Sequence, residues 1–233
     1  MIRVIKNKLR TSKIFGKTYV KLCEVKINIL NRHKKKNLQK NGYKVVALVQ
    51  KMLESSHVEF FFDMGTLLGI IRENRLLRHD MDIDVGVFLN DEEEKYELEK
   101  LLVSRGCTLK CRYFVDNIGL VEESFVCENV KFDINFYSHD IMSDICYLLY
   151  TNDQKEYKAH EMDVVKMQSI PIGKIKKVLF GNSLINIPEN AEKYLACRYG
   201  KNWRIPNKNY IYWKGPTALP INNIGRQQVF EEV

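Results

Sequence analysis

The spacing of the hydrophobic positions changes several times along this chain, and each change predicts a different element. Apolar residues three or four positions apart over 38–56 indicate a helix with one buried face. Apolar residues at every second position over 81–89 indicate a strand with one buried and one polar face. Similar reasoning predicts a strand at 58–62, a short helix from Gly65 to about Asn74, and a helix that Asn90 caps and Gly106 ends.

The second half of the chain is richer in strand patterns. We predict strands at 108–115, 118–127 and 130–137, short strands at 147–150 and 164–170, a hairpin at 176–187 around Gly181-Asn182, and a helix over 189–199. Residues 206–233 show no clear period and predict an irregular tail. The whole pattern favours an α+β fold, a mixed β-sheet flanked by helices.

The composition is that of an ordinary soluble protein, with 45% hydrophobic and 28% charged residues among 233. No apolar run approaches the roughly 18 residues of a membrane span, and the N-terminus has no signal-peptide pattern. Six cysteines without zinc-ligand spacing predict reduced, mostly buried thiols in a cytosolic protein.

The net charge of +8 is unevenly distributed. Residues 1–40 hold 13 Lys or Arg and one acid, whereas residues 41–233 hold 24 basic and 28 acidic residues. A basic amphipathic helical arm over 1–40 is typical of binding to an anionic membrane surface, although it could instead pack on its own domain. We expect no nucleic-acid partner, because the body at 41–205 and the tail at 206–233 are mildly acidic overall.

Three carboxylates stand at alternate positions in and before the strand at 81–89. Asp80, Asp82 and Asp84 would share one face, where like charges repel unless something compensates them. The natural compensation is one or two Mg²⁺ ions, or Mn²⁺, held together with a substrate phosphate. The alternative is an edge strand whose solvated face happens to be acidic.

A fourth carboxylate belongs to a different strand. In 130–137, apolar residues alternate with Lys131, Asp133 and Asn135. Asp133 therefore lies on the polar face in the middle of a strand, where a carboxylate needs a partner.

Four motifs follow one another along the chain: Gly65–Arg72, Asp80–Asp84, Lys131–Asn135 and Ile187–Trp203. In this order they resemble the LicD family of phosphotransferases, which includes the fukutin-like enzymes and has the nucleotidyltransferase fold. The resemblance covers roughly residues 55–205. One departure is clear, because His79 and Met81 replace two residues of the family's Trp-Asp-Asp-Asp-Ile-Asp pattern, while the alternating carboxylates remain.

The resemblance implies a catalytic domain that moves a phospho-alcohol, phosphocholine or a polyol phosphate, from a CDP-activated donor. The acceptor would be a hydroxyl of a cell-surface glycan, such as lipopolysaccharide, capsule or teichoic acid, or of its lipid-linked precursor, and CMP would be released. With the basic arm, this suggests a cytoplasmic protein, peripheral on the inner face of the cytoplasmic membrane. The donor alcohol stays open among choline, ribitol and glycerol.

The resemblance also implies roles for single residues. Asp82, Asp84 and Asp133 would hold metal, and Asp133 would also help to deprotonate the acceptor hydroxyl. Asp80 would orient these ligands or simply face water. Phosphate-binding candidates are Gly65, Thr66, Arg72, Arg78 and Lys131. Arg72 could instead form a structural salt bridge or hold Asp63, which is itself a candidate for substrate binding. His79 and His160 are weaker candidates for substrate contact.

Two other functions remain possible on the sequence alone. A nucleotidyltransferase that moves an NMP group to a small acceptor would use the same carboxylates but would release pyrophosphate. A non-catalytic scaffold in glycan assembly would show no Mg²⁺-dependent binding of a CDP compound.

Overall fold

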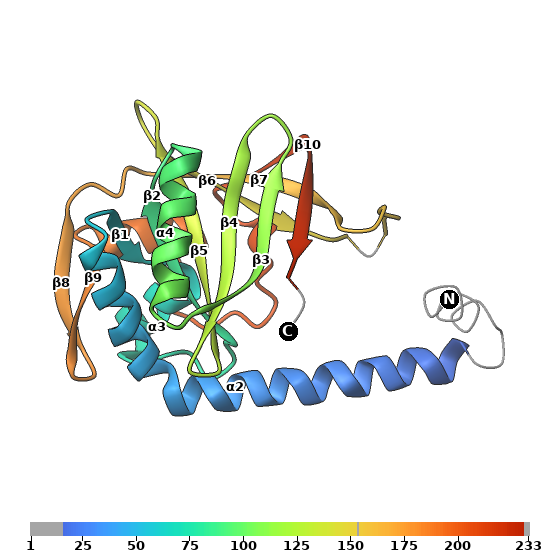
Figure 1. The fold of residues 1–233 in the computed structure, drawn as a ribbon. Coiled ribbons are helices and arrows are strands. Elements are labelled where there is room, and N and C mark those ends of the chain that lie inside the picture. The colour runs from blue at the N-terminus through green and yellow to red at the C-terminus, as the bar shows by residue number, and fades with distance from the viewer. Residues whose placement is uncertain (1–15, 153, 231–233) are drawn as a thin grey trace.

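The structure, a computed structural model, describes residues 16–152 and 154–230. Its centre is an eight-stranded sheet in the order β1-β2-β5-β4-β3-β10-β7-β6. Strand β6 also pairs with β5, so the sheet curls back on itself (Figure 1). The strands are β1 (Glu59–Phe62), β2 (Asp82–Phe88), β3 (Thr108–Val115), β4 (Gly119–Cys127), β5 (Val130–His139), β6 (Asp144–Tyr150), β7 (Glu161–Ser169) and β10 (Ala218–Val229).

Most neighbouring strands are antiparallel, but β2 and β5 run parallel, which makes the sheet mixed. A separate hairpin, β8 (Ile175–Phe180) and β9 (Ser183–Pro188), turns at Gly181-Asn182 as predicted, and Gly181 has a φ of +59°. The helices are α2 (Gly16–Ser55), α3 (Met64–Glu73), α4 (Glu92–Ser104), α5 (Ala191–Tyr199) and the 3₁₀ turn η1 (Tyr212–Lys214).

The core lies between the sheet and the helices. On β2 and β5, the side chains of Ile83, Val85, Phe132 and Ile134 are fully buried. Helix α2 packs on this part of the sheet and on β9, and its core residues follow the predicted helical spacing. These are Leu38, Val45, Val46, Val49, Met52 and Leu53.

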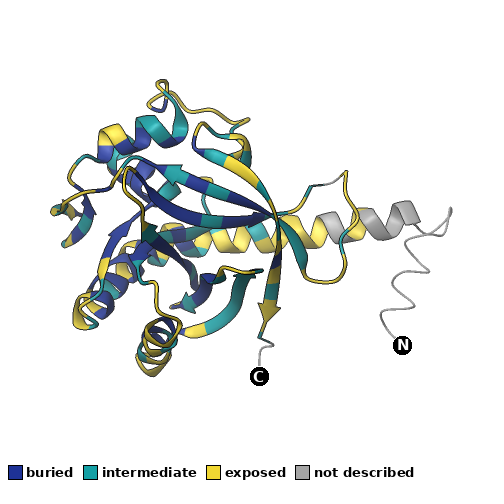
Figure 2. Ribbon diagram, turned by 90° about the horizontal axis from the view of Figure 1, so that it is seen from above, coloured by how far each residue is buried: buried dark blue, intermediate teal, exposed yellow. Residues whose placement is uncertain are grey.

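Helix α2 is much longer than the element predicted at 38–56. Its 40 residues form one continuous helix through the boundary expected at 40/41. The C-terminal part is covered by the domain, whereas the N-terminal part projects away from it and is exposed (Figures 1 and 2). In the described part of the chain, no helix is both long and apolar enough to cross a bilayer.

The mixed α+β architecture is confirmed, and two local predictions are wrong. The residue that caps α4 is Asp91 rather than Asn90, because the Asp91 carboxylate accepts from the backbone N–H groups of Glu93 and Glu94. The tail at 206–233 is not irregular, because residues 218–229 form β10, the strand that joins β3 to β7. The weak alternation of this strand and its register break between Ile221 and Ile224 hid it from pattern analysis.

Candidate active site

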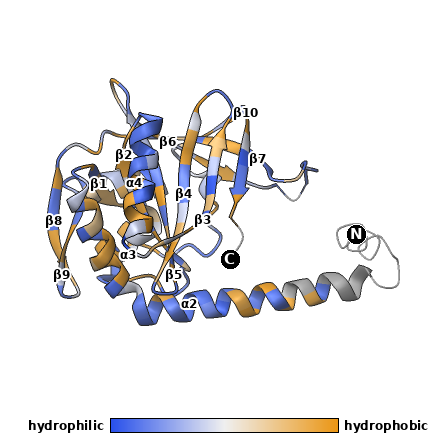
Figure 3. Cartoon of the chain, viewed as in Figure 1, coloured by the Kyte–Doolittle hydropathy of each residue, from blue (hydrophilic) through white to orange (hydrophobic). Residues whose placement is uncertain are grey.

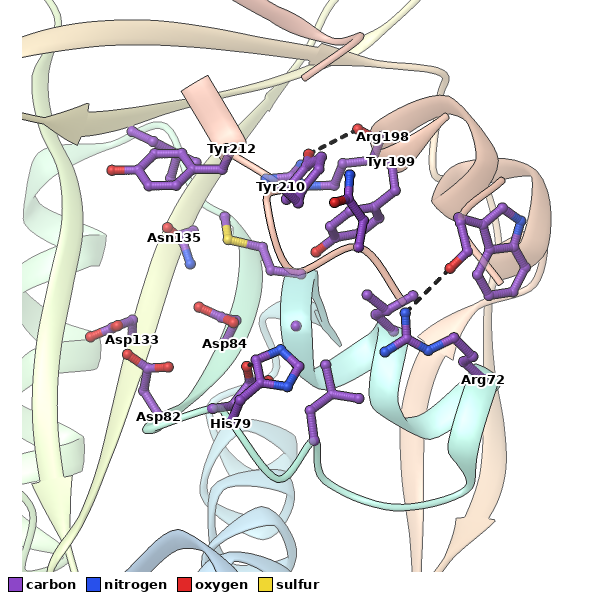
Figure 4. A pocket seen from close by; sticks show the side chains of 18 of the residues that line it. Arg72, His79, Asp82, Asp84, Asp133, Asn135, Arg198, Tyr199, Tyr210 and Tyr212 are labelled. Carbon is purple, nitrogen blue, oxygen red and sulfur yellow. Dashed lines mark hydrogen bonds and ion pairs between the residues drawn. The ribbon is translucent and has the colours of Figure 1, made fainter. Parts of the chain in front are cut away.

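A cavity of about 1110 Å³ opens on the polar face of the sheet where β2 and β5 run side by side. The start of α3, the turn before β2, the end of α5 and the segment 202–212 complete its wall. Its lining combines an acidic floor with an aromatic wall (Figure 4). The acids are Asp80, Asp82, Asp84, Glu122 and Asp133, and the aromatic residues are Tyr113, Tyr199, Trp203, Tyr210 and Tyr212, together with His79.

The parallel pairing of β2 with β5 brings the predicted carboxylates together. Asp84 lies opposite Asp133, and Asp82 lies opposite Lys131. The Lys131 ammonium reaches both neighbours, with its Nζ 2.6 Å from Asp133 Oδ2 and 3.4 Å from Asp82 Oδ2. On the other side, Ser124 of β4 donates its hydroxyl to Asp133 Oδ1 at 2.5 Å. Asp133 therefore has the partners that its position in the strand requires.

The carboxylates of this cluster are poorly compensated. Burial raises the pKa of Asp84 well above its usual value, and Asp82 and Asp133 raise it further. Burial also raises the pKa of Asp133, against the lowering effect of Lys131. For Lys131, burial favours the neutral amine, but Asp133, Asp82 and Glu122 outweigh it and raise the pKa well above the usual value. One ammonium thus serves several acids, and more positive charge would stabilise the cluster.

The described residues contain no group of three carboxylate, thiol or imidazole side chains already arranged as a metal site. The available oxygens nevertheless suit a hard divalent cation, since Mg²⁺ in proteins commonly takes one or two carboxylates and completes its shell with phosphate. Asp82, Asp84 and Asp133 supply such oxygens from two adjacent strands that line the cavity (Figure 4). Their role in holding metal stays a prediction.

Two hydrogen bonds join the start of α3 to the carboxylate-bearing strand β2. The backbone N–H of Asp63 donates to the carbonyl of Asp84 at 3.0 Å, and the N–H of Asp84 donates to Thr66 Oγ1 at 2.9 Å. Thr66 is almost fully buried, so its hydroxyl positions Asp84. Gly65 is different because it faces the cavity, where a Cβ would lie 2.7 Å from Asp80 Oδ2. Only glycine lets the Asp80 carboxylate approach the helix start this closely.

Asp80 lies in the turn before β2, so it does not share the strand with Asp82 and Asp84. It still lines the cavity, and burial followed by repulsion from Asp82 raises its pKa to about 7. The side chain of the preceding residue, His79, is 71% exposed, and its Nε2 lies 3.6 Å from Asp80 Oδ1.

Asp63 belongs to a buried network behind the cavity. Its carboxylate accepts hydrogen bonds from the hydroxyls of Tyr137 at 2.5 Å and Tyr194 at 2.7 Å. Arg198 donates to both hydroxyls from Nη1, at 3.2 and 3.1 Å. All four side chains are at least 97% buried. The two tyrosines therefore link a buried carboxylate to a buried guanidinium, and they fix α5 against the start of α3.

The remaining predicted cations lie in different places. Arg72 does not hold Asp63; it donates to the Trp203 carbonyl at 3.3 Å and pairs with Glu73 at 2.9 Å. Arg78 is exposed and is not part of the cavity wall. His160 is exposed too and lies outside the wall, so the structure does not bring it to the site.

Sequence reasoning missed a second polar row beside the carboxylates. Asn135 follows Asp133 on the same face of β5, and the pairing of β5, β4 and β3 places Asn135, Glu122 and Tyr113 side by side. The alternation that identified Asp133 also placed Asn135 on the polar face, but the sequence assigned it no role. Glu122 and Tyr113 could not be found in this way, because their position depends on the register between strands. Burial and then Asp133 raise the pKa of Glu122 to about 8.

Comparison with known proteins identifies the family of this chain. The chain is 24% identical to the ribitol-5-phosphate transferase FKTN of Macaca fascicularis and 23% identical to that of Homo sapiens, each over 202 residues. Each match covers 84% of this chain but only 40% of the relative. Residues 57–190, more than half of the chain, match the family described as LicD/FKTN/FKRP, nucleotidyltransferase domain. The protein therefore belongs to the LicD/FKTN/FKRP family, whose members include transferases of phosphate-linked alcohols.

Proposed function

We propose that this protein transfers a phospho-alcohol from a CDP-activated donor to a hydroxyl of a glycan or of its lipid-linked precursor, and that it releases CMP. The observation that carries the proposal is the carboxylate row of Asp84 and Asp133, with Asp82 beside it, in a cavity large enough for a nucleotide-linked substrate. Family membership and the activity for which the relatives are named, ribitol-5-phosphate transfer, support the same reaction class.

Asp82, Asp84 and Asp133 would hold one or two Mg²⁺ or Mn²⁺ ions, with Asp80 in support. When bound, the metal would neutralise charge on the diphosphate and on the departing CMP. Lys131 keeps Asp82 and Asp133 together through its two contacts, and its ammonium is near enough to assist with phosphate charge. The backbone N–H groups at the start of α3, around Gly65, favour an anion because the first amides of a helix lack partners within it.

In this proposal, Asp133 would receive the proton of the acceptor hydroxyl. That oxygen would form a bond to the transferred phosphorus while the bond from the same phosphorus to the CMP oxygen breaks. Ser124 fixes one oxygen of Asp133 and Lys131 the other, so the carboxylate is held in one orientation for this task.

Product analysis tests the reaction class. The protein is incubated with Mg²⁺ and CDP-ribitol, CDP-glycerol or CDP-choline, and binding is first scored as a metal-dependent rise in melting temperature. Release of CMP with one donor supports the proposal. Release of pyrophosphate from a nucleoside triphosphate would point to NMP transfer, and no metal-dependent binding of any CDP compound would favour a scaffold.

The projecting part of α2 supports a position on the cytoplasmic face of an anionic membrane. Five large apolar side chains between Leu22 and Leu30 are 48% to 63% exposed, which is unusual on a soluble monomer (Figure 3). Exposed basic residues surround them: Lys21, Lys26, Arg32, Lys34 and Lys36. A second copy of this helix would bring like charges together, whereas anionic lipid would complement them.

Vesicle sedimentation tests this placement independently of catalysis. The full chain should bind vesicles that contain phosphatidylglycerol, and added salt should weaken the binding. Lys26→Glu with Arg32→Glu should weaken it by at least about tenfold, since each charge near the surface contributes about 1 kcal/mol. Lys100→Glu, an exposed lysine on α4, is the control. Equal binding to neutral vesicles, or none to anionic ones, would refute the placement.

A further inference from the structure

Beside the carboxylate row lies a row of polar side chains that the proposed reaction does not yet use. On β5, Asn135 is two residues beyond Asp133, so the two side chains point to the same face about 7 Å apart. Glu122 of β4 pairs with Asn135, and Tyr113 of β3 pairs with Glu122. All three line the cavity.

The amide of Asn135 is the clearest sign that this row binds something. Asn135 is 99% buried, and its Nδ2 has no hydrogen-bond partner among the described residues. Buried amide donors are nearly always paired, because leaving one unpaired forfeits its solvation. The side chain points into the cavity beside Asp84 and Asp133 (Figure 4). A ligand acceptor atom at this place would complete it.

Glu122 supplies the matching acceptor. Within the described residues its side chain has no hydrogen-bond partner, and its carbonyl oxygen can accept hydrogen bonds whether or not the carboxyl group is ionised. The Tyr113 hydroxyl accepts a hydrogen bond from Gln227 Nε2 at 2.9 Å and also interacts with the Cys111 thiol, so it closes the end of the row. The row thus presents a donor, Asn135, beside an acceptor, Glu122, on adjacent strands.

This donor and acceptor fit a pair of neighbouring hydroxyls. Each hydroxyl donates one hydrogen bond and accepts others, so two adjacent hydroxyls can both donate to Glu122 while one of them accepts from Asn135. Cross-strand neighbours have Cβ atoms about 5 Å apart, which suits hydroxyls on adjacent carbons. A quaternary ammonium offers no such donors or acceptors and would leave Asn135 unpaired.

We propose that Asn135, Glu122 and Tyr113 form a subsite for a vicinal diol, adjacent to the reacting phosphate. The diol comes either from a polyol carried by the activated donor or from the acceptor sugar, and both present the same chemistry. The inference rests on the proposed function, because that function places the phosphate at the neighbouring carboxylate row. Asn135 and Glu122 are positioning residues here, since they hold the substrate without forming or breaking bonds.

Binding measurements with defined probes test the subsite. Wild type, Glu122→Gln and Asn135→Ala are titrated with CDP, CDP-ribitol and CDP-choline in the presence of Mn²⁺, and with methyl glycosides in the presence of Mn²⁺ and CDP. If the diol belongs to the donor, CDP-ribitol binds wild type at least about tenfold more tightly than CDP, and both variants abolish that difference. If it belongs to the acceptor, both variants instead lose the glycoside affinity. Either result supports the subsite.

Several controls distinguish a failure of the subsite from a failure of the proposed function. Glu97→Gln, on the exposed face of α4, should behave as wild type. Retained CDP and Mn²⁺ binding, with an unchanged circular dichroism spectrum, shows that the variants are folded. Wild type that binds no CDP refutes the proposed function itself. Three results would overturn the subsite alone. The first is that CDP binds but neither variant changes the affinity for the polyol or the glycoside. The others are that Glu122→Gln loses Mn²⁺ binding, or that the variants lower the affinity for CDP-choline more than that for the other ligands.

Discussion

Glu122 and Glu123 are neighbours on β4, yet they belong to two acidic clusters on opposite faces of the sheet. Glu122 faces the cavity with Asp82, Asp84 and Asp133, where Lys131 is the cation that contacts the described carboxylates. Glu123 is fully buried on the α4 side. There Arg112 Nε lies 3.5 Å from Glu123 Oε1 and donates a hydrogen bond to Glu99 Oε2 at 2.7 Å.

The difference shows what separates a candidate site from a structural cluster. Burial raises the pKa of a carboxyl group in both places. Only the cavity cluster combines several acids, few cations and open space into which a cation and a phosphate fit. Arg112 covers the α4-side cluster. Its guanidinium carbon also lies 4.9 Å from the ring centroids of Tyr96 and Phe230. A perturbed carboxylate therefore marks function only when its compensation is missing and its surroundings are accessible.

Among the substitutions considered, the largest effect should come from removing a carboxylate of the cavity cluster. Asp84→Asn should reduce CMP release by more than about a hundredfold, since several kcal/mol of charge stabilisation at the phosphate would be lost. The melting temperature should stay equal or rise, because the substitution removes repulsion among Asp82, Asp84 and Asp133. Steady-state rates and thermal melts measure the two quantities. Normal turnover in this variant would exclude Asp84 from the metal site.

The same comparison explains how far sequence reasoning reached. Alternation within one strand identified Asp82, Asp84 and Asp133, because a period of two fixes which side chains share a face. It could not find Glu122 or Tyr113, whose place in the cavity depends on how β3, β4 and β5 align. Strand register is set by contacts between distant segments and leaves little trace in a single sequence.

Thr66 and Asp63 show a second limit. The sequence placed both near the acidic strand, but as groups for substrate. The structure instead uses the Thr66 hydroxyl to hold the backbone of Asp84, and the Asp63 carboxylate to hold two tyrosines. A polar residue beside a site can bind the ligand or support the residues that do, and only burial and hydrogen-bond partners distinguish these roles.

A smaller effect is expected when the α4-side cluster loses its cation. Arg112→Met should lower the free energy of unfolding by about 2 kcal/mol, less than for a fully buried pair because Arg112 is 18% exposed. Arg226→Met is the matched control, since the Arg226–Asp116 pair on the neighbouring strand is largely exposed. Urea denaturation compares the two variants with wild type. Equal losses in both would mean that the Glu99–Glu123 cluster does not depend on Arg112.

The smallest effect at mildly acidic pH, and the one that distinguishes the clusters by pH, concerns Glu123. Its pKa rises from the usual 4.5 to about 9, first through burial and then through Glu99. The folded state therefore keeps a proton that the unfolded state releases, and this group makes the protein less stable as pH rises from about 4.5 to about 9.

Glu123→Gln removes this dependence of stability on pH, while it retains the size and polarity of the side chain. The variant should match wild type near pH 4 and exceed its free energy of unfolding by about 1 kcal/mol at pH 5.5, with a larger difference at pH 7 and above. Denaturation curves across this range measure the difference, and Glu97→Gln on the exposed face of α4 should show none. Catalytic rates should not change, because Glu123 faces away from the cavity. A difference that stays constant with pH would show that Glu123 is already ionised in the folded protein, and the contrast with Glu122 would then rest on access alone.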